Sequence, residues 1–340
     1  MAYTAGIRSV FHRKKRSTVH YVHSNRKGDV MLKYVLKRLG YILVTLWVIV
    51  TCTFFMMKNL PGTPFDAERF SIMTPQQQER VLEMYGLNDS LPMQYVKYIK
   101  NMLKGDLGTS FTYVNQDVSK VITGRLGPSA LIGIQAVLIG LAIGLILGIL
   151  AAWKHNSGID YFTMILAVLG VSVPNFVAAA LLQYYIGLKW GALPVGFWTG
   201  WNCSVLPSIA LSFSATAMVA RFMRTEMLDV LDQDYIVTAR AKGLSQMKVL
   251  MRHAVRNSIL PVVTILGPIV VNLMTGSLAV ENIFSIPGIG SLFVDCIKAN
   301  DYPVIMGITI FYAAFYMLIV LLVDLAYSLI DPRIRLAKGK

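Results

Sequence analysis

The chain has 340 residues, of which 55% are hydrophobic and only 15% are charged, and its mean hydropathy is +0.56. A soluble domain carries about 25% charged residues, so this composition excludes an ordinary soluble protein and indicates a polytopic membrane protein. The formal net charge of +14 would point to nucleic acid or an acidic partner in a soluble chain, but membrane topology explains it better.

Residues 1–30 form a polar, basic extension that contains the run His12-Arg13-Lys14-Lys15-Arg16. No apolar segment with a cleavage site precedes the first apolar run, so we do not interpret the extension as a secretory signal peptide. We expect it to be cytosolic and either disordered or attached to the membrane surface.

Six apolar runs are long enough to cross a bilayer as helices, which takes about 20 residues each. They are Leu39–Met57, Ser129–Trp153, Tyr161–Gly187, Val205–Met223, Ile259–Val280 and Tyr302–Ile330. With a cytosolic N-terminus, the segments 1–38, 154–160, 221–258 and 331–340 face the cytosol and hold 22 of the 32 lysines and arginines. That bias follows the positive-inside rule. The predicted fold class is therefore an all-α polytopic membrane protein with six transmembrane helices and both termini in the cytosol.

The segment 59–127 is predicted to be a small helical extracytoplasmic insert between the first transmembrane helix (31–58) and a core of five helices (128–330). Thr74-Pro75-Gln76-Gln77 offers the start of a helix that ends by Gly86. A second helix is expected from Pro92 to Lys104, closed by Gly105, and a third from Asn115 to Arg125. Residues 331–340 form a cytosolic tail.

The second span carries a row of small residues, Gly140, Gly144 and Gly148, four positions apart. Small residues at this spacing let two helix backbones approach closely inside a membrane. The row predicts tight helix packing and says nothing about a substrate.

The chain offers no phosphate-binding loop, because its only Gly-Lys pair is Gly339-Lys340. The five histidines and three cysteines show no metal-ligand spacing, so neither a catalytic nor a metal site is predicted. The amides Gln135, Asn175, Gln183 and Asn272 lie within the spans. They are candidates to line a translocation path, although bonding across helices is slightly favoured.

The polar insert Asp232–Pro261 between two apolar runs is the most specific feature of the sequence. Asp234 is a predicted N-cap, Tyr235–Lys242 gives two helical turns, and Gly243 can take the left-handed conformation that ends them. Thr238, Ala239 and Ala241 give this helix a small-residue surface that would fit a groove. Ser245 is then expected to cap a second helix. Its apolar stripe consists of Met247, Leu250, Met251, Ala254 and Val255, and its basic stripe of Lys248, Arg252 and Arg256. That second helix alone would also suit a surface of anionic lipid.

This insert resembles the cytosolic coupling loop of permease subunits of ABC importers, with Ala239, Gly243 and Ile259-Leu260-Pro261 at the matching places. It departs from the family pattern at Val237-Thr238-Ala239, where Glu-Ala-Ala is usual, and in the longer gap from glycine to proline; both departures are usual in the peptide-permease branch. Further segments resemble the B-type permease of oligopeptide, dipeptide and nickel importers over about Met31 to Leu336. In order they are Pro61-Gly62-Thr63-Pro64, Tyr85-Gly86-Leu87, Lys104-Gly105-Asp106-Leu107-Gly108-Thr109-Ser110, Phe284-Ser285-Ile286-Pro287-Gly288-Ile289-Gly290, Asp301-Tyr302-Pro303 and Asp331-Pro332-Arg333-Ile334-Arg335.

The resemblance implies a type I ABC importer permease fold in a prokaryotic cell membrane, with a coupling loop at 226–258. It implies three kinds of partner besides lipid: a second homologous permease, two ATPase subunits and an extracytoplasmic solute-binding protein. ATP and magnesium would bind the ATPases, so this chain would need no cofactor and catalyse nothing itself. The residues that would couple to an ATPase are Asp234, Tyr235, Thr238, Ala239, Lys242, Gly243 and Leu244.

Peptide is the expected substrate, with nickel as the alternative within the family. The alternatives from other classes are an ATP-independent channel or ion-coupled carrier, and a membrane-embedded enzyme. The lack of acidic residues near the midplane of the spans argues against the carrier. The absence of any nucleophile–base or metal pattern argues against the enzyme.

Overall fold

The computed structural model describes residues 35–59, 70, 72–84, 86–114, 116–274 and 278–330, without the side chains of 84 and 326–330. The predictions for the extension 1–30, the tail 331–340 and the segments Pro61–Pro64 and Asp331–Arg335 lie outside these residues. The chain divides into two compact units, Met1–Cys52 and Thr53–Lys340. In the first unit the described residues, 35–52, are helical.

The described part of the chain is helical, with one isolated antiparallel bridge between Thr109 and Asp117. Five helices are long and apolar enough to cross a membrane: Val35–Lys58, Val118–Trp153, Trp201–Leu231, Gln246–Ile283 and Tyr302–Leu325. A sixth candidate is the pair Gly158–Ser172 and Asn175–Lys189, bent by 101°. The six spans expected from the sequence fall on these five helices and the bent pair.

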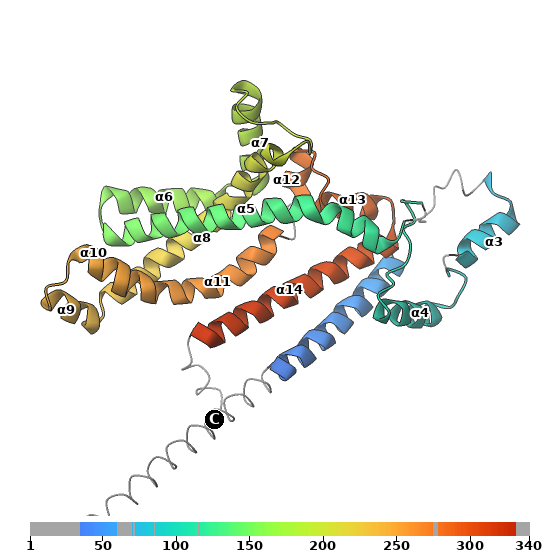
Figure 1. Ribbon diagram of the computed structural model, residues 1–340. Helices are drawn as coiled ribbons and strands as arrows, with labels where there is room; N and C mark the ends of the chain where they lie inside the picture. Colours follow the sequence, from blue (N-terminus) through green and yellow to red (C-terminus); the bar gives the residue numbers. More distant parts are fainter. Residues whose placement is uncertain are drawn as a thin grey trace, which may run out of the picture. The chain divides into compact units, whose positions relative to one another are not determined.

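The second unit is built around α5 (Val118–Trp153) and α8 (Val205–Leu231), which make its largest helix–helix contact (Figure 1). The glycine row of α5 lies against α8. A Cβ atom at Gly140 would be 2.8 Å from Cβ of Ala215, and one at Gly144 would be 2.7 Å from Cβ of Val219. At Gly148 the neighbour is Met223, which is fully buried. The two backbones approach so closely that a larger side chain has no room.

The helix expected at Asn115–Arg125 is instead the beginning of α5, which continues through Pro128 to Trp153. A proline inside a helix costs about 3 kcal/mol. Here Val118, Val121 and Ile122 are buried against α13 (Ile289–Lys298) and α14 (Tyr302–Ile330). The burial of these side chains offsets the cost of Pro128 and keeps the turns before the proline helical. The predicted boundary between insert and core, 127/128, therefore lies within one continuous helix.

The remaining insert helices are α3 (Pro75–Met84) and α4 (Leu91–Leu103). Both correspond to predicted helices. After α4, Gly105 adopts a positive φ of 83°, as expected for a glycine that ends a helix.

The bent span consists of α6 (Gly158–Ser172), α7 (Asn175–Leu182) and the π-helical segment η1 (Gln183–Lys189). The bend lies at Val173-Pro174, where Val173 is extended with ψ 118°. Proline lacks the N–H that would continue the helix, and it disfavours the helical conformation of the residue before it. In Figure 1, α7 accordingly leaves the direction of α6.

The chain then forms α9 (Asp234–Ala241), α10 (Gln246–Val249), the π-helical η3 (Leu250–Val255) and α11 (Arg256–Met274). A short α12 (Leu278–Ile283) precedes α13 and α14. We call the end of the second unit that holds α9, α10 and the α5–α6 turn the α9 end. The opposite end, with α12, α13 and the beginning of α5, is the α13 end (Figure 1).

Candidate functional site

Helix α9 is the two-turn helix expected in the polar insert, with shifted ends. Its N-cap is Gln233, with φ −78° and ψ 146°, and Asp234 is the first helical residue, so the prediction of Asp234 as N-cap was wrong. The carboxylate still lies in the first turn, where the helix dipole favours negative charge. The helix ends at Ala241, and Gly243 has φ 76°. The left-handed glycine predicted at this position is confirmed.

One face of α9 packs onto the rest of the protein. Ile236 and Ala239 are 0% and 6% exposed and form a small cluster with the buried Val249 of α10. Leu244, half-buried, packs against the same cluster. Ala239 is therefore not part of a free surface, which corrects the expectation that Thr238, Ala239 and Ala241 together would meet a partner. Sequence alone missed this because an alanine suits a tight internal contact as well as an external one.

The opposite face of α9 is exposed and consists of Asp234, Val237, Thr238 and Ala241. These positions follow i, i+3, i+4 and i+7 and so form one ridge. We call these four residues the α9 ridge. Val237 is 59% exposed and gives the ridge an apolar side chain.

Two further coupling candidates lie beside the α9 ridge. Tyr235 is 42% exposed, and its hydroxyl accepts a hydrogen bond of 2.9 Å from the side-chain amide of Asn257. Asn257 is the second residue of α11, so this bond joins α9 directly to a membrane helix. Lys242 is exposed.

The second helix of the insert is not separate from the fifth span. Ser245 is the N-cap of α10, without a side-chain capping bond, and the helical path runs on from Gln246 through η3 into α11. The predicted span Ile259–Val280 begins within this longer helical path, and the helix expected after Ser245 leads into it. Val249, Leu250 and Ala254 are buried, whereas Met247 and Met251 are 52% and 53% exposed, so the predicted apolar stripe is only partly the buried face.

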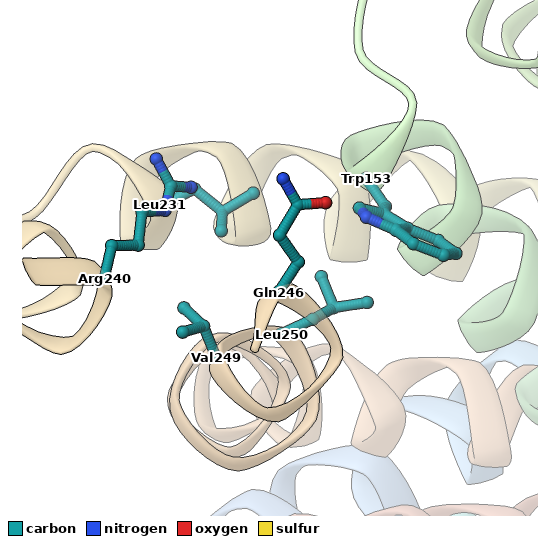
Figure 2. A pocket seen from close by; sticks show the side chains of 6 residues that line it. All are labelled: Trp153, Leu231, Arg240, Gln246, Val249 and Leu250. Carbon is teal, nitrogen blue, oxygen red and sulfur yellow. The ribbon is translucent and has the colours of Figure 1, made fainter. Parts of the chain in front are cut away.

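A pocket of about 160 Å³ lies between α9, α10 and the ends of α5 and α8 (Figure 2). Its walls are formed by Trp153, Leu231, Arg240, Gln246, Val249 and Leu250. Five of the six lie within the predicted coupling loop 226–258, and Trp153 comes from a distant segment, so the sequence did not show that they share one pocket.

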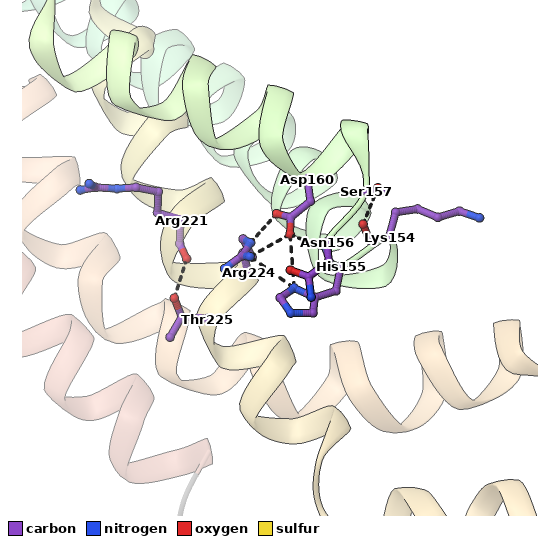
Figure 3. A network of polar contacts seen from close by, with 8 residues as sticks. All are labelled: Lys154, His155, Asn156, Ser157, Asp160, Arg221, Arg224 and Thr225. Atoms are coloured by element: carbon purple, nitrogen blue, oxygen red, sulfur yellow. Dashed lines mark hydrogen bonds and ion pairs between the residues drawn. The ribbon is translucent and has the colours of Figure 1, made fainter.

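An ion pair joins α6 to α8 at the α9 end (Figure 3). Nε and Nη2 of Arg224 donate to the two carboxylate oxygens of Asp160 at 2.6 and 2.8 Å. The carboxylate also accepts from the backbone N–H of Asn156 at 3.0 Å, and its side chain is 3% exposed. His155 lies on the same group, with Nδ1 3.2 Å from Oδ2 of Asp160. This bidentate pair holds the end of α8 that leads into α9.

A buried carboxylate, Glu281, organises the α13 end. The hydroxyl of Ser129 donates to its Oε1 at 2.7 Å, and the backbone N–H of Ser291 donates to its Oε2 at 2.9 Å. Ser129 in turn accepts from the N–H of Ile289 at 2.8 Å. Glu281 thus satisfies the N-terminus of α13 and joins α5, α12 and α13.

Asp301 is a second buried carboxylate that joins distant segments, and it is fully buried. Its Oδ2 accepts from the hydroxyl of Ser110 and, at 3.0 Å, from the N–H of Thr112. The segment after α4 is thereby fastened to the turn between α13 and α14.

The candidate path residues lie in different environments. Gln135 accepts a 2.8 Å bond from the hydroxyl of Ser208 on α8, and Gln183 donates to the carbonyl of Ile283 at 2.7 Å, so both bond across elements. Asn175 is half-buried at the bend before α7, and Asn272 is exposed on α11. Within the described ranges, no group of three or more His, Cys, Asp or Glu could hold a metal ion.

Two family models match the chain. Residues 31–127 match the N-terminal part of the binding-protein-dependent transport system membrane component. Residues 144–336 match the binding-protein-dependent transport system inner membrane component. The chain belongs to this family.

Curated relatives agree with the match. The dipeptide transport system permease protein DppB of Lactococcus lactis subsp. cremoris is 46% identical over 90% of this chain and 100% of that protein. DppB of Bacillus subtilis is 43% identical over 91% and 99%. The oligopeptide transport system permease protein OppB of Haemophilus influenzae is 39% identical over 90% and 100%. Among solved structures, an amino acid ABC transporter is 20% identical, with a TM-score of 0.48 over 63% of this chain and 94% of the other.

Proposed function

We propose that this chain is the permease subunit of an ATP-driven, binding-protein-dependent peptide importer. The observation that carries the proposal is the 46% identity to a dipeptide permease across 90% of this chain and the whole of that relative. Relatives named as dipeptide and as oligopeptide permeases share this likeness, so peptide is the substrate class we propose.

The α9 ridge is the surface we assign to a partner ATPase. It is exposed and carries an apolar residue, Val237, between the small polar Thr238 and the short Asp234. The reverse side of α9 is fixed by the Ile236–Ala239–Val249 cluster and by the bond from Asn257 to Tyr235. A push on the ridge would therefore move α9 and the beginning of α11 together, as a rigid lever.

The energy would come from ATP and magnesium bound to two ATPase subunits. A second homologous permease would complete the path, and a solute-binding protein would deliver the peptide at the α13 end. This arrangement places the α9 end and both termini in the cytosol of a prokaryote and makes the chain a non-catalytic subunit. The candidate path residues Gln135, Asn175 and Asn272 remain proposals, of which Asn272 is the most accessible.

Uptake by a strain that lacks this chain tests the proposal. Labelled dipeptide and longer peptides should enter the complemented strain and not the deletion strain, and labelled nickel should enter both equally. Restoration of nickel uptake alone would assign the chain to metal import. Peptide uptake by the purified chain alone, driven by an ion gradient without ATP, would assign it to the carriers.

Coupling is tested separately at the α9 ridge. Ala241→Glu places a charge on the exposed ridge and should uncouple ATP hydrolysis from peptide uptake without lowering expression. Ala192→Glu puts the same charge on an exposed residue at a loop after η1 and should leave ATPase binding unchanged. Ala239→Glu is a poor test of docking, because it buries a charge in the cluster beneath α9.

A further inference from the structure

The pocket beside α9 has a wall composition that points to a ligand. Arg240, Gln246 and Trp153 contribute a guanidinium, an amide and an indole, while Leu231, Val249 and Leu250 supply apolar surface. Figure 2 shows Gln246 between Arg240 and Trp153, with the apolar side chains around them. Guanidinium, amide and indole groups all donate hydrogen bonds, so an acceptor-rich, anionic group fits them best.

The pocket lies where three long helices begin or end. Trp153 is the last residue of one candidate span, Leu231 is the last residue of another, and Gln246 is the first residue of a third. Trp153 also ends the apolar run Ser129–Trp153, and tryptophan is enriched at the membrane–water interface, where lipid headgroups lie. The ammonium of Lys154, outside the pocket lining, lies 5.1 Å from the centre of the Trp153 ring.

Arg240 is the charged residue that lines the pocket. Among the described residues no carboxylate pairs with Arg240, in contrast to Arg224, which is held by Asp160. The volume of about 160 Å³ is below the roughly 300–1,000 Å³ of pockets that enclose a whole small molecule. It suits a headgroup whose remainder lies outside.

We propose that this pocket binds the headgroup of an anionic phospholipid from the leaflet at the α9 end. The phosphate would accept bonds from Arg240, Gln246 and Trp153, and the glycerol would lie on Leu231, Val249 and Leu250. Basic pockets between membrane helices are known to select anionic lipids on this basis. Because Arg240 belongs to α9 and Trp153 to α5, the lipid would tie α9 to the membrane domain. The binding itself does not depend on peptide import.

Native mass spectrometry of the intact complex, in bilayer discs with equal phosphatidylglycerol and phosphatidylcholine, tests the site. The wild-type complex should retain phosphatidylglycerol in preference to phosphatidylcholine. Arg240→Gln should weaken that retention roughly tenfold, as expected for loss of a charge-assisted hydrogen bond. Lys242→Gln is the matched control, because it removes the same charge two residues later from a side chain outside the pocket, and it should retain the lipid.

Three outcomes would overturn the proposal. An equal loss with Lys242→Gln would show only general attraction of lipid to a basic surface. Stabilisation of lipid-depleted complex by inorganic phosphate, with no effect of phosphatidylglycerol, would assign the pocket to a soluble anion. A photoreactive group at Gln246 that labels an ATPase subunit instead of lipid would assign it to a protein partner. Thermal unfolding of each variant shows whether it is folded.

Discussion

Replacing Arg224 by glutamine should destabilise the protein strongly, because it leaves the Asp160 carboxylate buried without its cation. That carboxylate is 3% exposed and receives two hydrogen bonds from Arg224, at 2.6 and 2.8 Å. Removing one partner of a buried pair costs about 3–5 kcal/mol. The double variant Asp160→Asn with Arg224→Gln should lose less than Arg224→Gln alone, because no charge is then left unpaired. The coupling energy between the two changes should be about 1–3 kcal/mol.

Thermal unfolding of the purified complex in one detergent measures these differences. At a loss of several kcal/mol, the midpoint for Arg224→Gln should fall by on the order of 10 °C. Arg221→Gln is the control, since Arg221 lies on the same helix, is exposed and points away from the pair in Figure 3. An unchanged midpoint for Arg224→Gln, or strict additivity in the double variant, would refute the role given to the pair.

Three other predictions concern the packing of the second unit. Glu281→Gln should lower the free energy of unfolding by about 1–3 kcal/mol, because one acceptor oxygen is replaced by a donor that faces buried donors. An unfolding midpoint equal to that of the wild type would contradict the role given to the hydrogen bonds of Glu281. Gly144→Val should disrupt the α5–α8 contact and lower the yield of folded protein by size exclusion, whereas Gly158→Ala, with no atom within 4 Å of the new Cβ, should not. Burial raises the pKa of the Cys296 thiol to about 12, so the reactive thiolate is scarce at pH 8. Maleimide should therefore label Cys296 at pH 8 only after denaturation, and rapid labelling of the native protein would show that the site opens.

Features with a local cause were predictable from the sequence. The spans follow from apolar length, and the close contact of α5 with α8 is consistent with glycines four residues apart. Gly243 takes its left-handed conformation because the chain must leave α9 at that point. Each of these depends on residues near one another in the sequence.

Features that depend on contacts between distant segments were missed. The extension of α5 to Val118 depends on packing against α13 and α14, and the inward position of Ala239 depends on Val249 of α10. Asp160 and Arg224 are 64 residues apart, and neither belongs to a recognisable motif. Glu281 stands at the outer end of the fifth apolar run and just before the segment Phe284–Gly290 that carried the family resemblance, and these two signals mark it without showing its partners Ser129 and Ser291.

The most direct test of the central claim is a crosslink from the α9 ridge. A photoreactive amino acid at Ala241, in the complex isolated from its own membrane, should form a crosslink to an ATPase subunit. The yield should change when ATP is bound and the ATPase pair closes. The same group at Ile165, 58% exposed within the apolar run of α6, should label lipid. A crosslink from Ala241 to lipid alone, with the ATPase present in the complex, would contradict the assignment of α9 as the coupling helix.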